Sequence, residues 1–264
     1  MPALPPPASL ARLRAARKLT SGTGRRAARA FLADGAQCVR EALALPGTVR
    51  ELFVSTRGAS AHPEFLGLGV PTWLASEQDV QRLTDTVTPQ GLVAVCAALP
   101  EVSFDPVAMG LVLIAAQVRD PGNAGALIRC ADAFGADAVV LTTGSVDLYN
   151  PKVVRASVGS LFHLPIVRNA ALGSVVDTCR DAGLRVLAGE GTGEARLDRL
   201  GAELARPTAW LFGNEAWGLP ARDAALADAR VAVPIFGRAE SLNLATAAAV
   251  CLYASATAQR AIVR

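Results

Sequence analysis

The sequence has few of the residues on which metal and disulfide sites depend. It contains two histidines, His62 and His163, and five cysteines with no Cys-x-x-Cys pair among them. An odd number of scattered cysteines without such a pair supports neither a disulfide framework nor a zinc cluster, and two histidines exclude a mechanism that requires several imidazole ligands. We therefore expect no metal site and no structural disulfides.

Long apolar runs are also missing, although 52% of the 264 residues are hydrophobic. The longest weakly polar stretch, residues 244–258, contains Thr and Ser and is shorter than the roughly 20 residues that span a bilayer. The N-terminus has prolines where a secretory signal would have its apolar core. These features predict a cytoplasmic protein with no membrane partner and a buried helix over residues 242–258.

Net charge is small, +3 overall, but it is unevenly distributed. The first 100 residues hold eleven basic and seven acidic side chains, whereas the remainder holds 15 and 16. Within residues 1–40 one acid, Asp34, stands against eight basic residues: Arg12, Arg14, Arg17, Lys18, Arg25, Arg26, Arg29 and Arg40. A basic stripe of this kind attracts a polyanion such as RNA, although a merely solvated surface would have the same composition.

Turn and linker residues divide the chain into four parts. We expect a basic N-terminal extension over 1–19 that is partly disordered, because its first eight residues are Pro-rich. An α/β unit over 20–98, a linker over 99–108 and a larger α/β domain over 109–264 follow. Before the linker, the predicted strands are 30–33, 49–55, 72–74 and 92–97, and the predicted helices are 10–19, 36–45, 63–68 and 76–83.

The larger domain alternates short apolar runs with helical patterns. Its apolar runs are continuous, which is typical of strands that are buried on both faces of a parallel sheet. The predicted strands are 111–116, 138–141, 164–167, 185–188, 209–212 and 231–235, and the predicted helices are 123–134, 151–159, 171–182 and 242–258.

Three loops that follow predicted strands carry clustered polar residues and glycine. Their polar side chains include Asn123, Arg129, Glu215, Ser241 and Asn243. Ligands of an open α/β sheet bind at the carboxyl ends of its strands, so these loops are candidates for a site. Ser241 is also a suitable helix N-cap, and a purely structural role stays open for it.

Several well-known catalytic and nucleotide-binding motifs are absent. The chain has neither a G-x-S-x-G segment nor a phosphate-binding G-x-x-x-x-G-K-[ST] loop. The run GEGTG at 189–193 follows a predicted strand but lacks the third glycine of a dinucleotide fingerprint. A nicotinamide-dependent dehydrogenase is therefore disfavoured, although it stays among the alternatives.

Four segments together resemble the SpoU/TrmH family of RNA ribose 2′-O-methyltransferases, within the SPOUT superfamily. They are DPGNAGALIRCADAFGAD (120–137), YNPKVVRASVGSLFHLPI (149–166), LFGNEAWGLP (211–220) and VAVPIFGRAESLNLATAAAVCLY (231–253). The segment RRAARAFLADGAQCVREAL (25–43) is similar to the ribosomal-protein-like substrate-binding domain that often accompanies such enzymes. The resemblance implies a small α/β substrate-binding domain and a SPOUT α/β domain with a parallel sheet and a deep C-terminal trefoil knot.

The resemblance also implies S-adenosylmethionine as cofactor, no metal, and a homodimer with a shared active site. It assigns cofactor contacts to Gly213, Asn214, Gly218, Val233, Ile235 and Leu242. It assigns the catalytic polar set to Asn123, Arg129, Glu215, Ser241 and Asn243. It implies that Arg155 in the RASxG motif holds RNA or the dimer interface near the site. We expect further RNA contacts from Lys18, Arg25 and Arg26 in the basic stripe.

Two roles stay open for Arg129. The family proposal makes its counterpart the base that takes the proton of the ribose 2′-hydroxyl, but a guanidinium is not ordinarily deprotonated in proteins. Alternatively, Arg129 clamps the adjacent phosphate and stabilises the developing alkoxide. We expect 2′-hydroxyl methylation of RNA, with 23S ribosomal RNA favoured as substrate. Transfer RNA as substrate and a non-catalytic RNA-binding scaffold are the alternatives.

Overall fold

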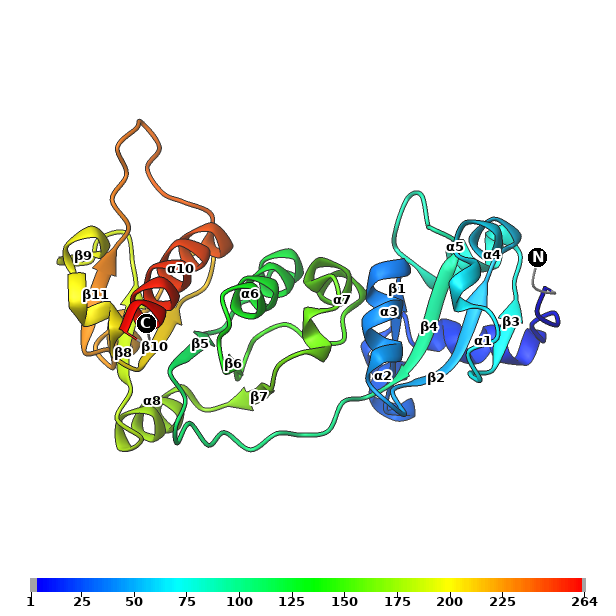
Figure 1. Cartoon of the computed structure of the whole chain (residues 1–264), viewed down its shortest axis with the longest axis horizontal. Coiled ribbons are helices and arrows are strands. Elements are labelled where there is room, and N and C mark those ends of the chain that lie inside the picture. The colour runs from blue at the N-terminus through cyan, green and yellow to red at the C-terminus, as the bar shows by residue number, and fades with distance from the viewer. Residues whose placement is uncertain (1–3, 263–264) are drawn as a thin grey trace. The chain divides into compact units, whose positions relative to one another are not determined.

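A computed structural model describes residues 4–262, which form two compact units. Unit 1 contains the chain up to Pro100 together with Asp147–His163, and unit 2 contains Glu101–Val146 and the chain from Leu164 onward (Figure 1). The sequence places residues 147–163 in the larger domain. In the structure this segment packs in unit 1, where the Tyr149 ring stacks on Phe31 with ring centroids 4.5 Å apart.

Unit 1 is built on a four-stranded mixed sheet in the order β1-β4-β2-β3. Strand β4 is antiparallel to β1 and β2, and β3 is parallel to β2. The strands are β1 (Ala30–Asp34), β2 (Val49–Val54), β3 (Thr72–Leu74) and β4 (Leu92–Ala97). The helices are α1 (Leu10–Lys18), α2 (Gly22–Ala28), α3 (Ala36–Ala44), α4 (Thr56–Ala61), α5 (Glu77–Leu83) and α7 (Pro151–Ser157), with 3₁₀ turns η1 (Pro63–Phe65) and η2 (Ser160–Phe162).

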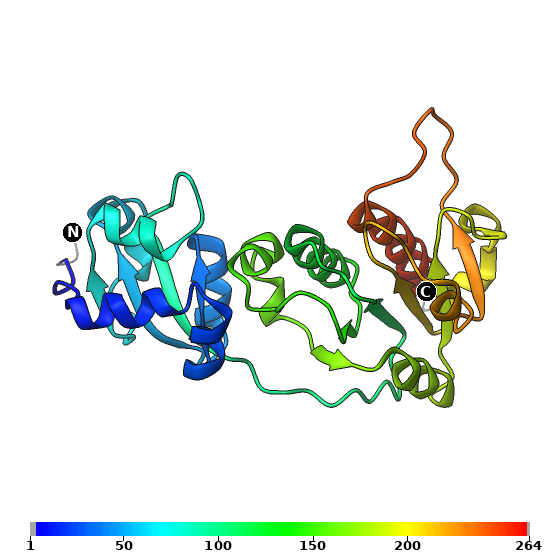
Figure 2. The ribbon, with the colours of Figure 1, turned by 180° about the vertical axis from the view of Figure 1, so that it is seen from behind.

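Alternate residues of the strands in unit 1 face opposite helical layers. Leu32 of β1 joins a buried cluster with Ala16 of α1 and Leu83 of α5, so these helices cover one face of the sheet. Phe31, one residue earlier, faces α3 and α7 on the other side. Figure 2 shows α1 crossing the sheet on the first of these faces.

The sequence-based expectations for unit 1 need two corrections. The predicted helix over 63–68 is wrong, because only the turn η1 forms there and Gly67 follows with a left-handed φ of 78°. The N-terminal extension is ordered from Pro6, where Leu74 of β3 donates a hydrogen bond to the Pro6 carbonyl and accepts one from the Ala8 amide, each 2.8 Å long. Residues 1–3 lie outside the described part of the chain.

Unit 2 contains a seven-stranded parallel sheet in the order β7-β6-β5-β10-β8-β11-β9. Every pair of neighbouring strands in it is parallel, and β5, β6 and β10 are buried throughout, as the continuous apolar runs predict. The strands are β5 (Leu111–Ala115), β6 (Ala138–Thr142), β7 (Ile166–Ala170), β8 (Arg185–Gly189), β9 (Ala195–Arg196), β10 (Thr208–Phe212) and β11 (Ala229–Ala232). The helices are α6 (Pro121–Ala133), α8 (Leu172–Asp181), α9 (Ala221–Ala224) and α10 (Leu244–Ile262), with turns η3 (Leu197–Arg199) and η4 (Gly201–Ala205).

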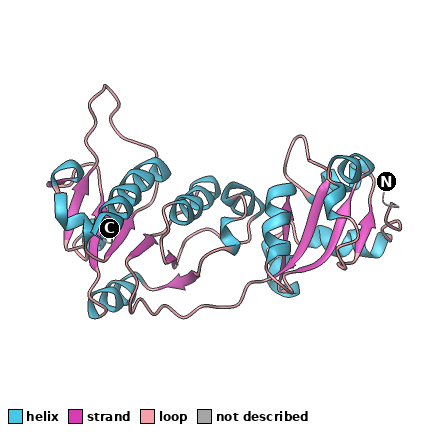
Figure 3. Cartoon of the chain, in the orientation of Figure 1, coloured by secondary structure: helices cyan, strands magenta, loops and turns pink. Residues whose placement is uncertain are grey.

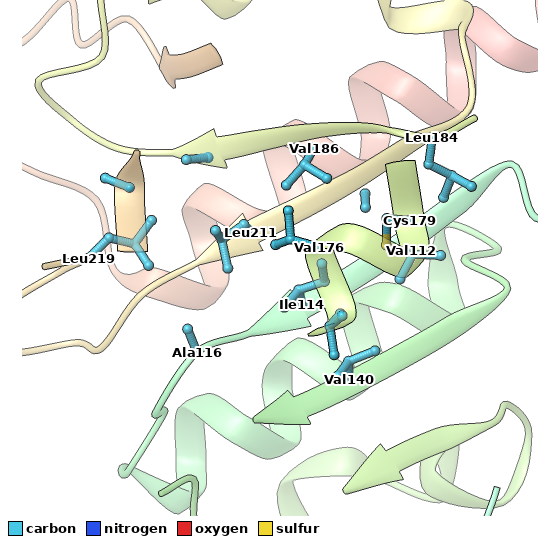
Figure 4. Close-up of a cluster of buried hydrophobic side chains, with 14 of the residues drawn as sticks. Val112, Ile114, Ala116, Val140, Val176, Cys179, Leu184, Val186, Leu211 and Leu219 are labelled. Atoms are coloured by element: carbon cyan, nitrogen blue, oxygen red, sulfur yellow. The ribbon is translucent and has the colours of Figure 1, made fainter. Parts of the chain in front are cut away.

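The sheet of unit 2 is covered by helices on both faces. On one face, Val176 and Cys179 of α8 pack on Val186 and Leu211 (Figure 4). On the other face, α6 and α10 lie side by side, and the indole Nε1 of Trp210 donates a buried 2.9 Å hydrogen bond to Ser255 of α10. The apolar stretch at the C-terminal end is therefore a helix packed on this sheet, and within residues 4–262 no helix is long and apolar enough to cross a membrane.

Two strands of unit 2 differ from the predicted boundaries. The predicted strand 231–235 ends at Ala232, because Pro234 has no N–H to donate to the sheet. The predicted strand 164–167 is shifted to Ile166–Ala170. Between β4 and β5, residues 98–110 form no helix or strand (Figure 3), and the predicted linker 99–108 lies within this segment.

Candidate active site

A cavity of about 210 Å³ lies at the carboxyl ends of β8, β10 and β11. Strand ends and the loops that follow them line one side, and α10 lines the other. Of the predicted cofactor contacts, Asn214, Gly218, Val233, Ile235 and Leu242 line this cavity. An open parallel sheet places its ligand sites at this edge.

The loop after β10 is shaped by glycine and by Asn214. A Cβ atom at Gly213 would lie 2.4 Å from the backbone of Gly218, so a side chain at this position would force the loop apart. The backbones of Asn214 and Gly218 exchange two hydrogen bonds of 3.0 and 2.8 Å. The Asn214 amide also donates to the Gln117 carbonyl over 2.7 Å, which fixes this loop to the loop after β5.

Glu215 joins the same two loops. Its carboxylate accepts hydrogen bonds from the backbone N–H groups of Arg119 and Asp120. Asp120 in turn caps α6 by accepting from the Asn123 backbone N–H over 2.7 Å. The predicted catalytic residue Glu215 therefore holds together two of the three polar loops.

The third loop reaches α6 through two asparagines. The Asn243 amide donates to the Asn123 side-chain oxygen over 3.0 Å. The Asn243 oxygen accepts from the N–H groups of Ala245 and Thr246, so Asn243 caps α10. The suggested capping role of Ser241 is therefore wrong. Ser241 instead lines the cavity.

The cavity has an apolar side that includes Val233, Leu244 and Cys251. Burial raises the pKa of the Cys251 thiol to about 12, so this group stays protonated at neutral pH and is a poor nucleophile. The described residues contain no group of three or more His, Cys, Asp or Glu side chains that could hold a metal ion.

Arg129 is not part of the cavity lining. It lies six residues after Asn123 on α6, which places the two side chains about 120° apart around the helix axis. Its side chain is exposed, and within residues 4–262 it makes no hydrogen bond or ion pair. The structure thus joins Asn123, Glu215 and Asn243 and leaves Arg129 apart from them.

The predicted RNA contacts have different surroundings in unit 1. Lys18 and Arg26 are exposed. Arg155 pairs with Asp85 and donates to the Thr86 hydroxyl over 3.1 Å. Arg25 is only 7% exposed. Its guanidinium donates hydrogen bonds to the Asp147 carboxylate over 2.7 Å and to the carbonyls of Leu19 and Thr20. Arg25 therefore has a structural role, unlike the exposed members of the basic stripe.

Comparison with known families identifies the chain. The sequence pattern of the SpoU rRNA Methylase family matches residues 110–253, which is more than half of the chain. The chain belongs to the SpoU rRNA methylase family. A second pattern, that of the MRM3-like substrate binding domain, matches residues 11–94 of this methylase.

Individual relatives agree with this assignment. The 23S rRNA (guanosine(2553)-2′-O)-methyltransferase RlmP of Bacillus subtilis (strain 168) is 38% identical over 237 residues, 90% of this chain and 92% of that protein. A 23S rRNA (uridine(2479)-2′-O)-methyltransferase of Streptomyces viridochromogenes is 42% identical over 137 residues, 50% of this chain and 47% of that protein. The SpoU methyltransferase AviRb from the same organism, solved with AdoMet, is similar with a TM-score of 0.80 and 29% identity, covering 96% of this chain and 100% of that one.

These findings confirm the predicted family, the α/β fold, the methyltransferase activity on RNA and S-adenosylmethionine as the cofactor. The residues of the methylase fit such a cofactor. The backbone of Gly218 leaves no room for a side chain at Gly213, and the apolar lining offers a surface for an adenine ring. One buried carboxylate oxygen on the cavity wall, from Glu190, has no hydrogen-bond partner among residues 4–262.

Some lining residues of the methylase were not predicted from the sequence. They include Glu190, Phe212 and Cys251. The run GEGTG at 189–193 was the one sequence signal that included Glu190. It was interpreted as a weak dinucleotide loop, and the sequence does not reveal that it lies beside β11.

Proposed function

We propose that this methylase transfers a methyl group from S-adenosylmethionine to one ribose 2′-hydroxyl of 23S ribosomal RNA. The observation that carries the proposal is the order of two domains on one chain, a substrate-binding domain over 11–94 and a methylase over 110–253. A Bacillus subtilis relative that covers 90% of the chain acts on 23S ribosomal RNA. A cytoplasmic location is part of this proposal, as is the C-terminal trefoil knot of the family.

The polar set positions the acceptor hydroxyl. S-adenosylmethionine supplies an activated methyl group, so the protein mainly provides orientation and electrostatic stabilisation. The linked side chains of Asn123 and Asn243 have little freedom to reorient, and Ser241 offers its hydroxyl inside the cavity. We assign the orientation of the ribose to these residues and the stabilisation of the developing oxyanion to Arg129.

A homodimer completes this site. Arg129 is exposed and has no partner among the described residues 4–262, and on α10 the side chains of Val250 and Tyr253 are 38% and 60% exposed. A second copy that covers this face of α6 and α10 would bury apolar surface and bring its own Arg129 to the cavity of the first. Light scattering at micromolar concentration should give twice the mass of the 27.3 kDa chain, and a monomer would contradict the shared site.

Unit 1 supplies the general affinity for RNA in this proposal. Lys18 and Arg26 are exposed on neighbouring helices, where they can contact phosphates without reading the bases. The target nucleotide then depends on RNA shape and base contacts. Mapping of 2′-O-methylated nucleosides in ribosomal RNA, from cells with and without the gene, tests the substrate. The loss of one 2′-O-methyl group from 23S ribosomal RNA is expected, and a loss from transfer RNA instead would overturn the substrate assignment.

A further inference from the structure

Glu190 occupies the first position after β8, within the GEGTG run. Its backbone N–H donates to the Val231 carbonyl of β11 over 3.0 Å, and its own carbonyl accepts from the Gly193 N–H over 3.0 Å. These two bonds fix the position of the residue between neighbouring strands. Its side chain lines the same cavity as Asn214 and Leu242.

One oxygen of the Glu190 carboxylate is buried and unsatisfied. Oε2 is inaccessible to solvent, and no group within residues 4–262 donates a hydrogen bond to it. Arg230 is the nearby cation, but its Nη1 lies 3.9 Å from this oxygen, too far for a hydrogen bond. The Nε of Arg230 binds Glu194 instead, at 3.0 Å. A buried acceptor without a donor is unfavourable. The Glu190 side chain as a whole is 23% exposed and lines the cavity, so a ligand that turns the carboxylate away from Arg230 can provide the missing donor.

The chemistry of the cofactor narrows the choice of donor. A carboxylate only accepts hydrogen bonds, and S-adenosylmethionine offers the ribose hydroxyls, the adenine amino group and the α-ammonium group. The guanidinium of Arg230, 3.9 Å from the carboxylate, would repel a second cation such as the ammonium. Two neighbouring hydroxyls match the two oxygens of one carboxylate, and acidic residues near strand ends bind ribose hydroxyls in other nucleotide sites.

We propose that the Glu190 carboxylate accepts hydrogen bonds from the ribose hydroxyls of S-adenosylmethionine and so positions the cofactor in the cavity. Glu190 is a positioning residue in this account and takes no part in the transfer of the methyl group. The proposal rests on the cofactor and does not depend on which RNA is methylated.

Calorimetric titration of the full-length protein with S-adenosylhomocysteine tests the proposal without any turnover. Glu190→Gln should weaken this ligand between about tenfold and about a hundredfold, as expected for the loss of a hydrogen bond to a charged group. Glu194→Gln is the matched control, because Glu194 binds the same arginine but is 62% exposed and does not line the cavity. This control should bind as the unmodified protein does.

Deoxy analogues identify the group that Glu190 recognises. The unmodified protein should bind the 2′-deoxy or 3′-deoxy form of S-adenosylhomocysteine about tenfold or more weakly than the parent ligand. With the same deoxy analogue, the affinity of Glu190→Gln should be close to that of the unmodified protein, because the hydroxyl that Glu190 would contact is already absent. Equal binding of the parent and deoxy ligands by the unmodified protein needs no variant, so it would overturn the proposal even if Glu190→Gln does not fold.

Three results would overturn the proposal. Equal binding of the parent and both deoxy ligands by the unmodified protein would exclude a hydroxyl contact. A loss in Glu190→Gln that disappears with 5′-methylthioadenosine, which lacks the amino-acid part, would assign Glu190 to the ammonium group. A lower thermal midpoint with unchanged affinity would make Glu190 a structural partner of Arg230. If the unmodified protein bound no S-adenosylhomocysteine at all, the cofactor assignment would be contradicted. That result differs from a failure of the Glu190 contact alone, in which the ligand still binds.

Discussion

The side-chain amide of Asn243 donates a 3.0 Å hydrogen bond to the side-chain oxygen of Asn123, 120 residues earlier in the chain. It joins the first turn of α6 to the start of α10. The same Asn243 side chain caps α10 through the N–H of Ala245 at 2.9 Å. One residue thus stabilises a helix and orients a second polar group at the proposed active site.

Substitution of each asparagine separates these two roles. Asn243→Ala removes the cap and the link, so we expect a loss of about 1 kcal/mol in the free energy of unfolding together with a loss of methyl transfer. Asn123→Ala removes the link alone, so methyl transfer should fall while the thermal midpoint stays near that of the unmodified protein. Full methyl transfer by Asn123→Ala would show that the link has no catalytic value.

Two neighbouring arginines of α2 should behave in opposite ways. Arg25→Ala leaves Asp147 and two backbone carbonyls without their partner, so we expect a loss of about 3 kcal/mol in stability. Arg26→Ala removes an exposed charge, which should weaken RNA binding without a change in stability. Its plot of log affinity against log salt concentration should become shallower by about 0.7 to 0.9. Weaker RNA binding by a fully folded Arg25→Ala variant would contradict the structural role of Arg25.

Gly213 tests the shape of the cofactor loop. A Cβ atom there would come within 2.4 Å of the Gly218 backbone, so Gly213→Ala should displace the loop and weaken S-adenosylhomocysteine about tenfold or more. Gly173 on α8 is the control, since nothing lies within 4 Å of a Cβ atom at that position. Gly173→Ala should leave ligand affinity unchanged. Calorimetry of both variants decides the matter, and normal affinity in Gly213→Ala would refute the close approach.

Because Asp34 is a buried carboxyl group, we expect the stability of unit 1 to depend on pH. Burial raises the pKa of its carboxyl group above the usual 3.8, although a hydrogen bond from the Thr86 hydroxyl and the charge of Arg155 oppose the shift. Because the pKa of Asp34 is higher in the folded than in the unfolded state, its contribution to the free energy of unfolding is fully present below pH about 4. That contribution is lost as pH rises through the folded-state pKa. Asp34→Asn should therefore raise the thermal midpoint at pH 7, and the difference should vanish near pH 3.5. A lower midpoint at pH 7 would contradict this sign.

The sequence predicts the sheet of unit 2 well because its strands are continuous apolar runs. Its less regular parts depend on contacts that sequence spacing does not reveal. Strand β9 (Ala195–Arg196) has two residues and no apolar run, and it forms only because it pairs with β11. Helix α4 begins at the Ser55 cap, but the interior Gly58, where a Cβ atom would lie 2.1 Å from the Gly91 carbonyl, hides its helical pattern.

The candidate active site, too, is predicted from the sequence only in part. Asn123, Glu215 and Asn243 were predicted because motifs place them in loops after strands, and the structure joins them through hydrogen bonds. Glu190 was not predicted, because its role depends on β8 lying beside β11, about 40 residues further along the chain. The exposure of Arg129 depends on its angle around α6, which the sequence motifs do not reveal.

Methyl transfer in a purified system tests the central claim most directly. The full-length protein is incubated with S-adenosylmethionine carrying a labelled methyl group and with unmodified transcripts of 23S ribosomal RNA, and the nucleosides are then identified by mass spectrometry. We expect one labelled 2′-O-methylnucleoside with the unmodified protein and none with Arg129→Ala, which should still bind S-adenosylhomocysteine. Label on a base, or equal transfer by Arg129→Ala, would contradict it.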